Sequence, residues 1–145
     1  MKSSYIKNSW FPLKVIIVVS SELGIGLAAN RAAVLATGLA MHVPNLPGQN
    51  LKTKDNVELL GFTQIPIPIL TARQNVSFHE LANKSKELGC KVIVFLTRAQ
   101  GMRSYEEYRI SISETNSNEL DIDAIAIYGD KKSVTKVTGN LPSLR

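Results

Sequence analysis

The chain has 145 residues, 44% hydrophobic and 20% charged, with 9 Gly, 6 Pro and a formal net charge of +5. This is the composition of a globular protein, so it excludes a disordered or collagen-like chain. We expect a single domain over residues 1–145, in which residues 1–12 form an N-terminal extension.

The chain is expected to be cytoplasmic, with no membrane segment, cofactor or metal. Its strongly apolar run near the N-terminus, Val15–Val19, is too short for a bilayer span or a signal peptide. The single cysteine, Cys90, excludes an internal disulfide framework and a multi-cysteine zinc site, and it fits a reducing compartment.

The positive charge does not predict a nucleic-acid surface. Residues 1–54 hold six Lys or Arg against Glu22 alone, and the rest of the chain nets zero. The basic residues are spread without interleaved aromatics, which is typical of solvated surface. We therefore expect no specific tRNA binding.

The first half of the chain predicts a buried strand, a helix, a long connection and an edge strand. Leu13–Val19 is rich in β-branched residues and almost continuously apolar, which is typical of a central strand. After a turn over 20–26, a helix continues to about Met41. Its alanines recur every four residues and are expected to form one ridge against the sheet: Ala28, Ala32, Ala36 and Ala40.

Residues 42–64 are rich in Pro, Gly and polar side chains and are expected to be a connection. In the strand expected over Ile65–Leu70, Pro66 and Pro68 remove backbone donors from the same edge. The segment is therefore predicted to be an edge strand that pairs through its isoleucines.

The second half predicts alternating helices and strands. Ser77 and Glu80 have capping-box spacing, and Gly89 suits the end of the helix that they begin. Ser104 and Glu107 repeat the spacing, although the following YRISIS could also alternate as a strand. Further elements are expected at Lys91–Thr97 (strand), Asp123–Tyr128 (strand) and Lys132–Val137 (helix). The predicted class is α/β, with one mixed sheet of about four strands and helices on both faces.

Two stretches carry a resemblance to a known fold. The run IIVVSSELGIG before an alanine-rich helix, and the closing Val137–Leu141 (VTGNL), resemble the two ends of the type-two peptidyl-tRNA hydrolase fold. The resemblance implies a three-layer α/β domain from Leu13 to Leu141.

A nearer resemblance is to the uncharacterised, bacterial-type family called domain of unknown function two thousand. Its members look like shortened relatives of the hydrolase, so this resemblance implies the fold and no reaction. The shared pattern comprises Glu22, Leu23, Asn30, the loop Pro44–Gly48, Asp55, Gly61 and Gly129.

The hydrolase chemistry does not carry over. In ungapped register, Leu27 and Ala29 stand where that family has two turn lysines, and Ala33 and Ala36 replace its helix glutamine and histidine. The loop 114–123, where the family has an arginine, contains none. Cations for tRNA phosphates and a group to activate water are thus absent from the family's positions.

The turn after the first strand is the candidate ligand site, since open α/β sheets bind ligands beyond the carboxyl ends of their strands. A small anion could meet backbone N–H groups at the helix start. The alternatives are a tight turn in which glycine supplies a positive φ, and an Asn30 that only faces water. The candidate residues are Ser20, Ser21, Glu22, Gly24, Gly26 and Asn30.

The other conspicuous side chains favour no site. His42 and His79 lack ligands at metal-binding spacing, and Cys90 is expected to be an inert buried hydrophobe. Trp10 and Phe11 either cover the core or mark a partner surface.

Two functions are consistent with these residues. The first is a non-hydrolytic protein that binds a small, perhaps anionic, ligand in a hydrolase-like cleft, with a homodimer left open. The second is a hydrolase of a small ester or amide, or a divergent peptidyl-tRNA hydrolase, in which Ser20 or Ser21 acts with Glu22. The first is preferred because no local His or Lys could activate a hydroxyl.

Overall fold

A computed structural model describes residues 13–145. Along the chain it contains β1 (Leu13–Ser20), α2 (Ile25–His42), β2 (Leu51–Lys52), β3 (Glu58–Leu59), β4 (Ile69–Ala72), α3 (Phe78–Glu87), β5 (Lys91–Leu96), α4 (Tyr105–Ser113), β6 (Ile122–Asp130) and α5 (Lys131–Thr138), with 3₁₀ turns η1 (Thr97–Gly101) and η2 (Ser117–Glu119). The expected Trp10 and Phe11 contacts lie outside the described residues.

Four strands form a mixed sheet in the order β4-β1-β6-β5. Strand β1 is parallel to β4, with Ile17 opposite Ile69, and antiparallel to β6. Strand β5 is antiparallel to β6, so β1, β4 and β5 all run in the same direction. The predicted α/β class, four-stranded mixed sheet and helices on both faces are confirmed.

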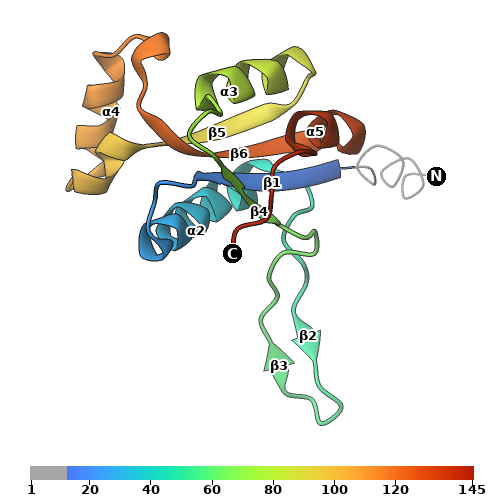
Figure 1. Ribbon diagram of the computed structural model, residues 1–145. Helices are drawn as coiled ribbons and strands as arrows, with labels where there is room; N and C mark the ends of the chain where they lie inside the picture. The colour runs from blue at the N-terminus through green and yellow to red at the C-terminus, as the bar shows by residue number, and fades with distance from the viewer. Residues whose placement is uncertain (1–12) are drawn as a thin grey trace.

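Helix α2 covers one face of the sheet, and α3 and α5 cover the other (Figure 1). Alternate β1 residues serve the two layers: Val15, Ile17 and Val19 pack toward α2, whereas Ile16 and Val18 pack with α3 and α5. This division explains the unbroken apolar run Val15–Val19 within β1, because these residues are buried on both faces of the sheet.

The buried face of α2 differs from the predicted alanine ridge. Ala28 and Ala32 are buried, Ala36 is half-buried and Ala40 is exposed. A spacing of four residues advances about 40° beyond a full turn, so such a ridge winds off the sheet within three steps. The face that stays on the sheet follows a mixed spacing of three and four residues, through Ala28, Arg31, Ala32, Leu35 and Leu39.

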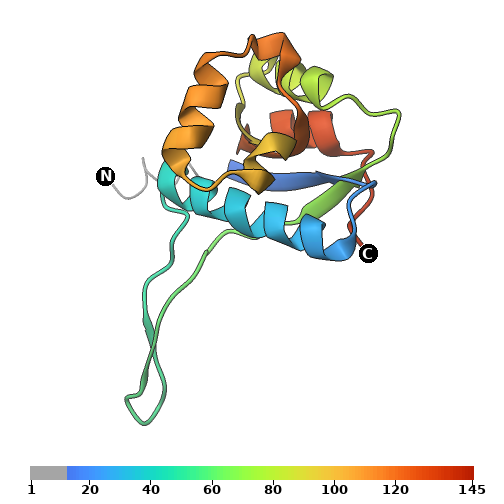
Figure 2. The ribbon, with the colours of Figure 1, turned by 90° about the vertical axis from the view of Figure 1, so that its left-hand side faces the viewer.

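The connection 42–64 is not irregular throughout. Strands β2 and β3 pair as a hairpin, with Leu51 opposite Leu59, and Asn56 turns it with a φ of 69°. The hairpin projects away from the sheet (Figures 1 and 2). Its large apolar side chains are exposed rather than packed in the core: Leu51, Val57, Leu59, Leu60 and Phe62.

Strand β4 begins later than predicted. It starts at Ile69, so of the three isoleucines expected to pair, only Ile69 lies in the strand. Pro68 still contributes through its carbonyl, which accepts the Ile17 N–H at 3.0 Å. Strand β4 lies at one end of the sheet order, as predicted, but the predicted pairing through its isoleucines is wrong. Pro68 faces β1, whereas the Ile69 carbonyl accepts the Leu144 N–H of the C-terminal segment, which pairs with the outer edge.

Local signals in the second half match the structure. The Ser77 and Ser104 hydroxyls accept the N–H groups of Glu80 and Glu107 at 3.2 and 3.1 Å, so both capping predictions are confirmed. Gly89 follows α3 with a φ of 84°, the left-handed conformation expected there.

Candidate functional site

The carboxyl ends of β1, β4 and β5 lie at the same edge of the sheet, because these strands run in one direction. Ser20 ends β1, and the Ser21 N–H donates to the carbonyl of Ala72 at the end of β4, at 2.8 Å. The turn that precedes α2 therefore crosses this edge, where ligands of open α/β sheets bind.

A cleft of about 360 Å³ opens at this edge between the start of α2 and the C-terminal segment. Its polar lining includes Ser20, Ser21, Thr71 and Arg145, and its apolar lining includes Leu23, Ile25, Ala28, Pro142 and Leu144. No Asp, Glu, His or Lys is among the described residues that line it. The residues that line the cleft thus include several with hydroxyl groups and one, Arg145, with a permanent positive charge.

Arg145 reaches the cleft because the C-terminal segment pairs with β4. The Thr71 N–H donates to the Pro142 carbonyl at 2.9 Å, and the Leu144 N–H donates to the Ile69 carbonyl at 2.9 Å. The segment runs beside β4 in Figure 1. Sequence reasoning missed Arg145, since no local signal links it to a turn more than a hundred residues earlier.

The six predicted site residues are not all brought together. Ser20 and Ser21 line the cleft, but Glu22, Gly24, Gly26 and Asn30 are absent from its lining. The Ser20 hydroxyl accepts the Glu22 N–H at 3.2 Å, and Glu22 itself is exposed. Asn30 is also exposed, which favours the water-facing alternative.

The positive-φ interpretation of Gly24 and Gly26 is wrong. Gly24 caps α2 with an extended φ of −63°, and Gly26 lies within the first turn of the helix. A Cβ atom added to either would meet nothing within 4 Å. Neither glycine is required by backbone conformation or by packing, and both leave open space at the start of α2.

Arg31 contradicts the interpretation of the basic residues as solvated surface. Its side chain is 1% exposed and its guanidinium lies 4.4 Å above the Phe95 ring. Nε and Nη2 donate to the Asp123 carboxylate at 3.1 and 2.9 Å, and Nη2 also donates to Gln100 at 2.9 Å. The Thr97 hydroxyl donates to the same carboxylate at 2.9 Å. Nη1 is the only buried side-chain nitrogen or oxygen of the described chain without a hydrogen-bond partner.

A second arginine organises the loop before β6. The Arg98 Nε donates to the Asp121 carboxylate at 2.7 Å, and Nη1 donates to Thr115 at 2.7 Å and to Ser111 at 3.2 Å. The loop 114–123 contains no arginine, but the turn η1 that follows β5 supplies Arg98 to it. Both arginines are bound to acidic residues, so they hold the strand ends together and neither presents a free cation in the cleft.

The histidines and the cysteine do not converge on a site. Within residues 13–145, no cluster of three or more His, Cys, Asp or Glu side chains could hold a metal ion. The His79 Nε2 lies 2.7 Å from the Leu120 carbonyl oxygen, so this contact joins α3 to the segment that precedes β6. Cys90 is buried, as expected, and burial raises the pKa of its thiol, with the charge of Asp130 adding to the effect.

Helices over residues 13–145 all fall short of the length and apolar character needed to span a bilayer. A comparison with curated proteins gave no match.

The model of the family described as "Protein of unknown function (DUF2000)" matches residues 13–145. The chain belongs to the DUF2000 family.

A solved structure shares the DUF2000 chain's fold. It is that of the protein of unknown function Atu0240 from Agrobacterium tumefaciens strain C58, at 16% identity and a TM-score of 0.82. The match covers 93% of the present chain and 99% of the other. At this identity the likeness shows the fold alone.

Three glycines in the pattern that resembles DUF2000 have structural explanations. A Cβ atom on Gly48 would lie 2.9 Å from the Phe62 carbonyl oxygen, and one on Gly61 would lie 2.4 Å from that of Gln49. Both glycines therefore permit close backbone approach at the base of the hairpin. Gly129 in β6 lies beside Cys90, which directly precedes the neighbouring strand β5, and a Cβ atom added to it would lie 3.1 Å from the Cys90 Sγ. These positions serve packing and not chemistry.

Proposed function

We propose that this DUF2000 protein is a non-hydrolytic relative of type-two peptidyl-tRNA hydrolase that binds a small anionic ligand in the cleft between α2 and the C-terminal segment. The observation that carries the proposal is that Ser20, Ser21 and Arg145 together line one cleft at the carboxyl ends of β1 and β4. An arginine with neighbouring hydroxyl donors matches a carboxylate or phosphate group.

The composition of the cleft also supports binding in preference to hydrolysis. A serine nucleophile needs a general base, and arginine remains protonated and cannot act as one. Glu22, the partner of the hydrolase alternative, is exposed and lies outside the lining. The apolar residues Leu27, Ala29 and Ala33, at the hydrolase family's polar positions, are exposed on α2 and supply no phosphate contacts.

Thermal unfolding in the presence of inorganic phosphate, small dicarboxylates and nucleoside monophosphates tests the proposal. A ligand at about 100 times its dissociation constant adds about 2.7 kcal/mol to the free energy of unfolding. For a domain near 150 residues this raises Tm by roughly 5–10 °C. Arg145→Gln is expected to abolish the shift, whereas Lys132→Gln, which removes the same charge from an exposed position on α5, should preserve it.

Equal ligand shifts in the two variants would refute the proposed cleft. Hydrolysis of p-nitrophenyl acetate that disappears in Ser20→Ala would instead favour the esterase alternative. Because Ser20 accepts one exposed backbone N–H, its removal should leave the fold intact, and circular dichroism checks this.

A further inference from the structure

The two edges of the sheet are treated differently. The outer edge of β4 is closed by the C-terminal segment, through the hydrogen bonds of Thr71 with Pro142 and of Leu144 with Ile69. Strand β5 pairs with β6 on one side only. Within the described chain, no residue of 91–96 forms a backbone hydrogen bond on its other side.

An open edge of this kind is unusual. Alternate residues of a strand direct both N–H and C=O groups to the same edge, so β5 offers a row of unused donors and acceptors. The strand contains no proline, and its one charged residue, Lys91, lies at its start. It therefore lacks the features by which sheet edges usually resist pairing.

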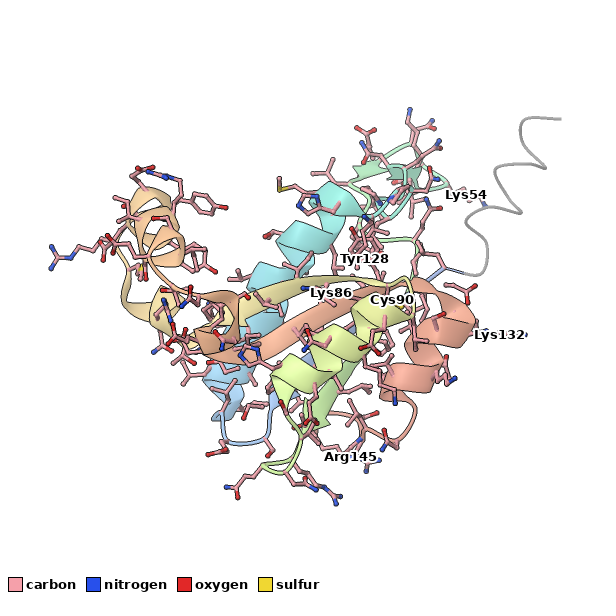
Figure 3. The ribbon with its side chains drawn as sticks, turned by 90° about the horizontal axis from the view of Figure 1, so that it is seen from above. Lys54, Lys86, Cys90, Tyr128, Lys132 and Arg145 are labelled. Atoms are coloured by element: carbon pink, nitrogen blue, oxygen red, sulfur yellow. The ribbon has the colours of Figure 1, made fainter. Side chains whose placement is uncertain are left out.

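Hollows flank β5 on both faces of the sheet. One of about 690 Å³ lies toward α3 and includes Ala82, Val92 and Leu120 in its lining. Another of about 580 Å³ lies toward α2 and includes Ile93 and Phe95. Seen from above, β5 lies uppermost between α3 and α2, and α4 stands at its carboxyl end (Figure 3).

Helix α4 adds an aromatic wall to this edge. Tyr105 and Tyr108 line the hollow on the α2 side, together with Val94 and Leu96. Tyr105 is 81% exposed, and its ring centroid lies 6.0 Å from that of Tyr108. No residue of α4 is buried, so this helix presents its apolar side to the open end of β5 instead of to the core.

The charged residues beside the open edge of β5 indicate which kind of segment binds there. Lys86 and Lys91 line the α3 hollow and Arg103 lines the α2 hollow, whereas neither lining contains Asp or Glu. A second copy related by a two-fold axis would bring the same basic surface against itself. An acidic segment would instead complement it.

We propose that the open edge of β5 binds an extended, acidic segment of another protein, which adds a fifth strand to the sheet. Backbone hydrogen bonds to β5 supply affinity, and alternate side chains of the segment enter the two hollows. Apolar side chains fit against Val94, Tyr105 and Tyr108, and carboxylates fit near Lys86, Lys91 and Arg103. This site is separate from the cleft at Arg145.

Three fluorescein-labelled octapeptides test the edge by fluorescence anisotropy: (Glu-Val)₄, (Lys-Val)₄, and a (Glu-Val)₄ variant whose backbone nitrogens are methylated at residues 3–6. At low salt the acidic peptide is expected to bind at least about tenfold more tightly than the lysine peptide, with the ratio narrowing as salt screens the charges. The methylated peptide should lose binding, because it lacks two N–H donors on each of its two edges while it keeps every side chain.

The double variant Lys86→Glu/Lys91→Glu should weaken binding of the acidic peptide at least about tenfold at low salt. Its matched control, Lys131→Glu/Lys132→Glu, has the same net charge and alters exposed residues of α5. Amide hydrogen exchange should slow within residues 91–96 on addition of (Glu-Val)₄.

Equal binding of all three peptides, equal effects of the two double variants, or no binding at millimolar peptide would overturn the proposal. A concentration-dependent dimer in sedimentation, with residues 91–96 protected in the chain alone, would overturn it in favour of a second copy.

Discussion

Replacing Arg31 with methionine is expected to be among the most damaging single changes in the described chain. The Arg31 guanidinium and the Asp123 carboxylate are 1% and 12% exposed and share two hydrogen bonds. Met fills most of the aliphatic volume of Arg but leaves the Asp123 carboxylate without its cation. Gln100 also loses its hydrogen bond.

Breaking a buried ion pair from one side typically costs about 3–5 kcal/mol. That is a large fraction of the roughly 5–15 kcal/mol that separates a folded domain from its unfolded chain. At about 2–4 °C per kcal/mol for a chain of this size, Tm should fall by roughly 6–20 °C. Urea unfolding gives the free energy directly, and an unchanged m value would show that the folded state keeps its compactness.

The double variant Arg31→Met/Asp123→Leu should recover much of the loss, since a buried pair can be replaced by apolar side chains at little net cost. Arg109→Met is the control, because Arg109 forms an exposed ion pair with Glu106 within α4. Exposed pairs contribute little, so this variant should unfold close to the unaltered protein. If Arg31→Met is no more destabilising than Arg109→Met, the buried pair does not hold α2 to β6.

Gly129→Ala places a Cβ atom 3.1 Å from the Cys90 sulfur and should lower the free energy of unfolding by about 1–3 kcal/mol. Gly101→Ala is the control, because its added Cβ atom meets nothing within 4 Å and should leave the stability unchanged. Urea unfolding measures both variants. Burial and the charge of Asp130 raise the pKa of the Cys90 thiol, so iodoacetamide should modify the folded chain more slowly than the unfolded chain. The raised pKa stabilises the folded chain at a pH below the ordinary thiol pKa of about 8.5, and this contribution should fall as the pH rises above that value. The free energy of unfolding is measured at increasing pH for the unaltered chain and for Cys90→Ser, which lacks the thiol. Asn30→Ala should raise stability by roughly half a kcal/mol, and a loss of the ligand-induced Tm shift would show that Asn30 contacts the ligand after all. Binding of tRNA should be weak and lost between low and physiological salt, and filter binding that shows submicromolar affinity against competitor RNA would contradict this.

The parts of the fold that were predictable depend on local signals. A capping hydroxyl binds a backbone N–H only three residues further along the chain, as that of Ser77 does. A strand that is buried on both faces can be recognised from its apolar composition, as β1 can. The hairpin was missed because β2 and β3 have two residues each, too few to show an alternating pattern. The turn at Ser20 was located by a rule about strand ends, but its partner Arg145 depends on pairing between distant segments.

Arg31 illustrates a different limit. Its position fits the buried face of α2, three residues after Ala28 and four before Leu35, so the spacing contained a signal. Its charge argued for solvent, because arginine is almost never fully buried without a partner. That partner, Asp123, is 92 residues away and only the sheet topology brings it close. The burial of a charged residue such as Arg31 therefore depends on its ion-pair partner, and the sequence of one segment alone does not show where that partner lies.

Because the β2–β3 hairpin projects from the sheet, the chain can be regarded as two fragments that are joined only by this hairpin. Residues 13–46 contribute β1 and α2, residues 65–145 contribute the other sheet strands, and the sheet itself pairs the two fragments through β1 with β4 and β6. The turn between β2 and β3 lies at the far end of the hairpin (Figure 2), and Asp55 and Asn56, which lie between these strands in the sequence, are exposed. Opening the chain there would break no strand pairing of the central sheet, so this is where new termini or an inserted domain would disturb it least.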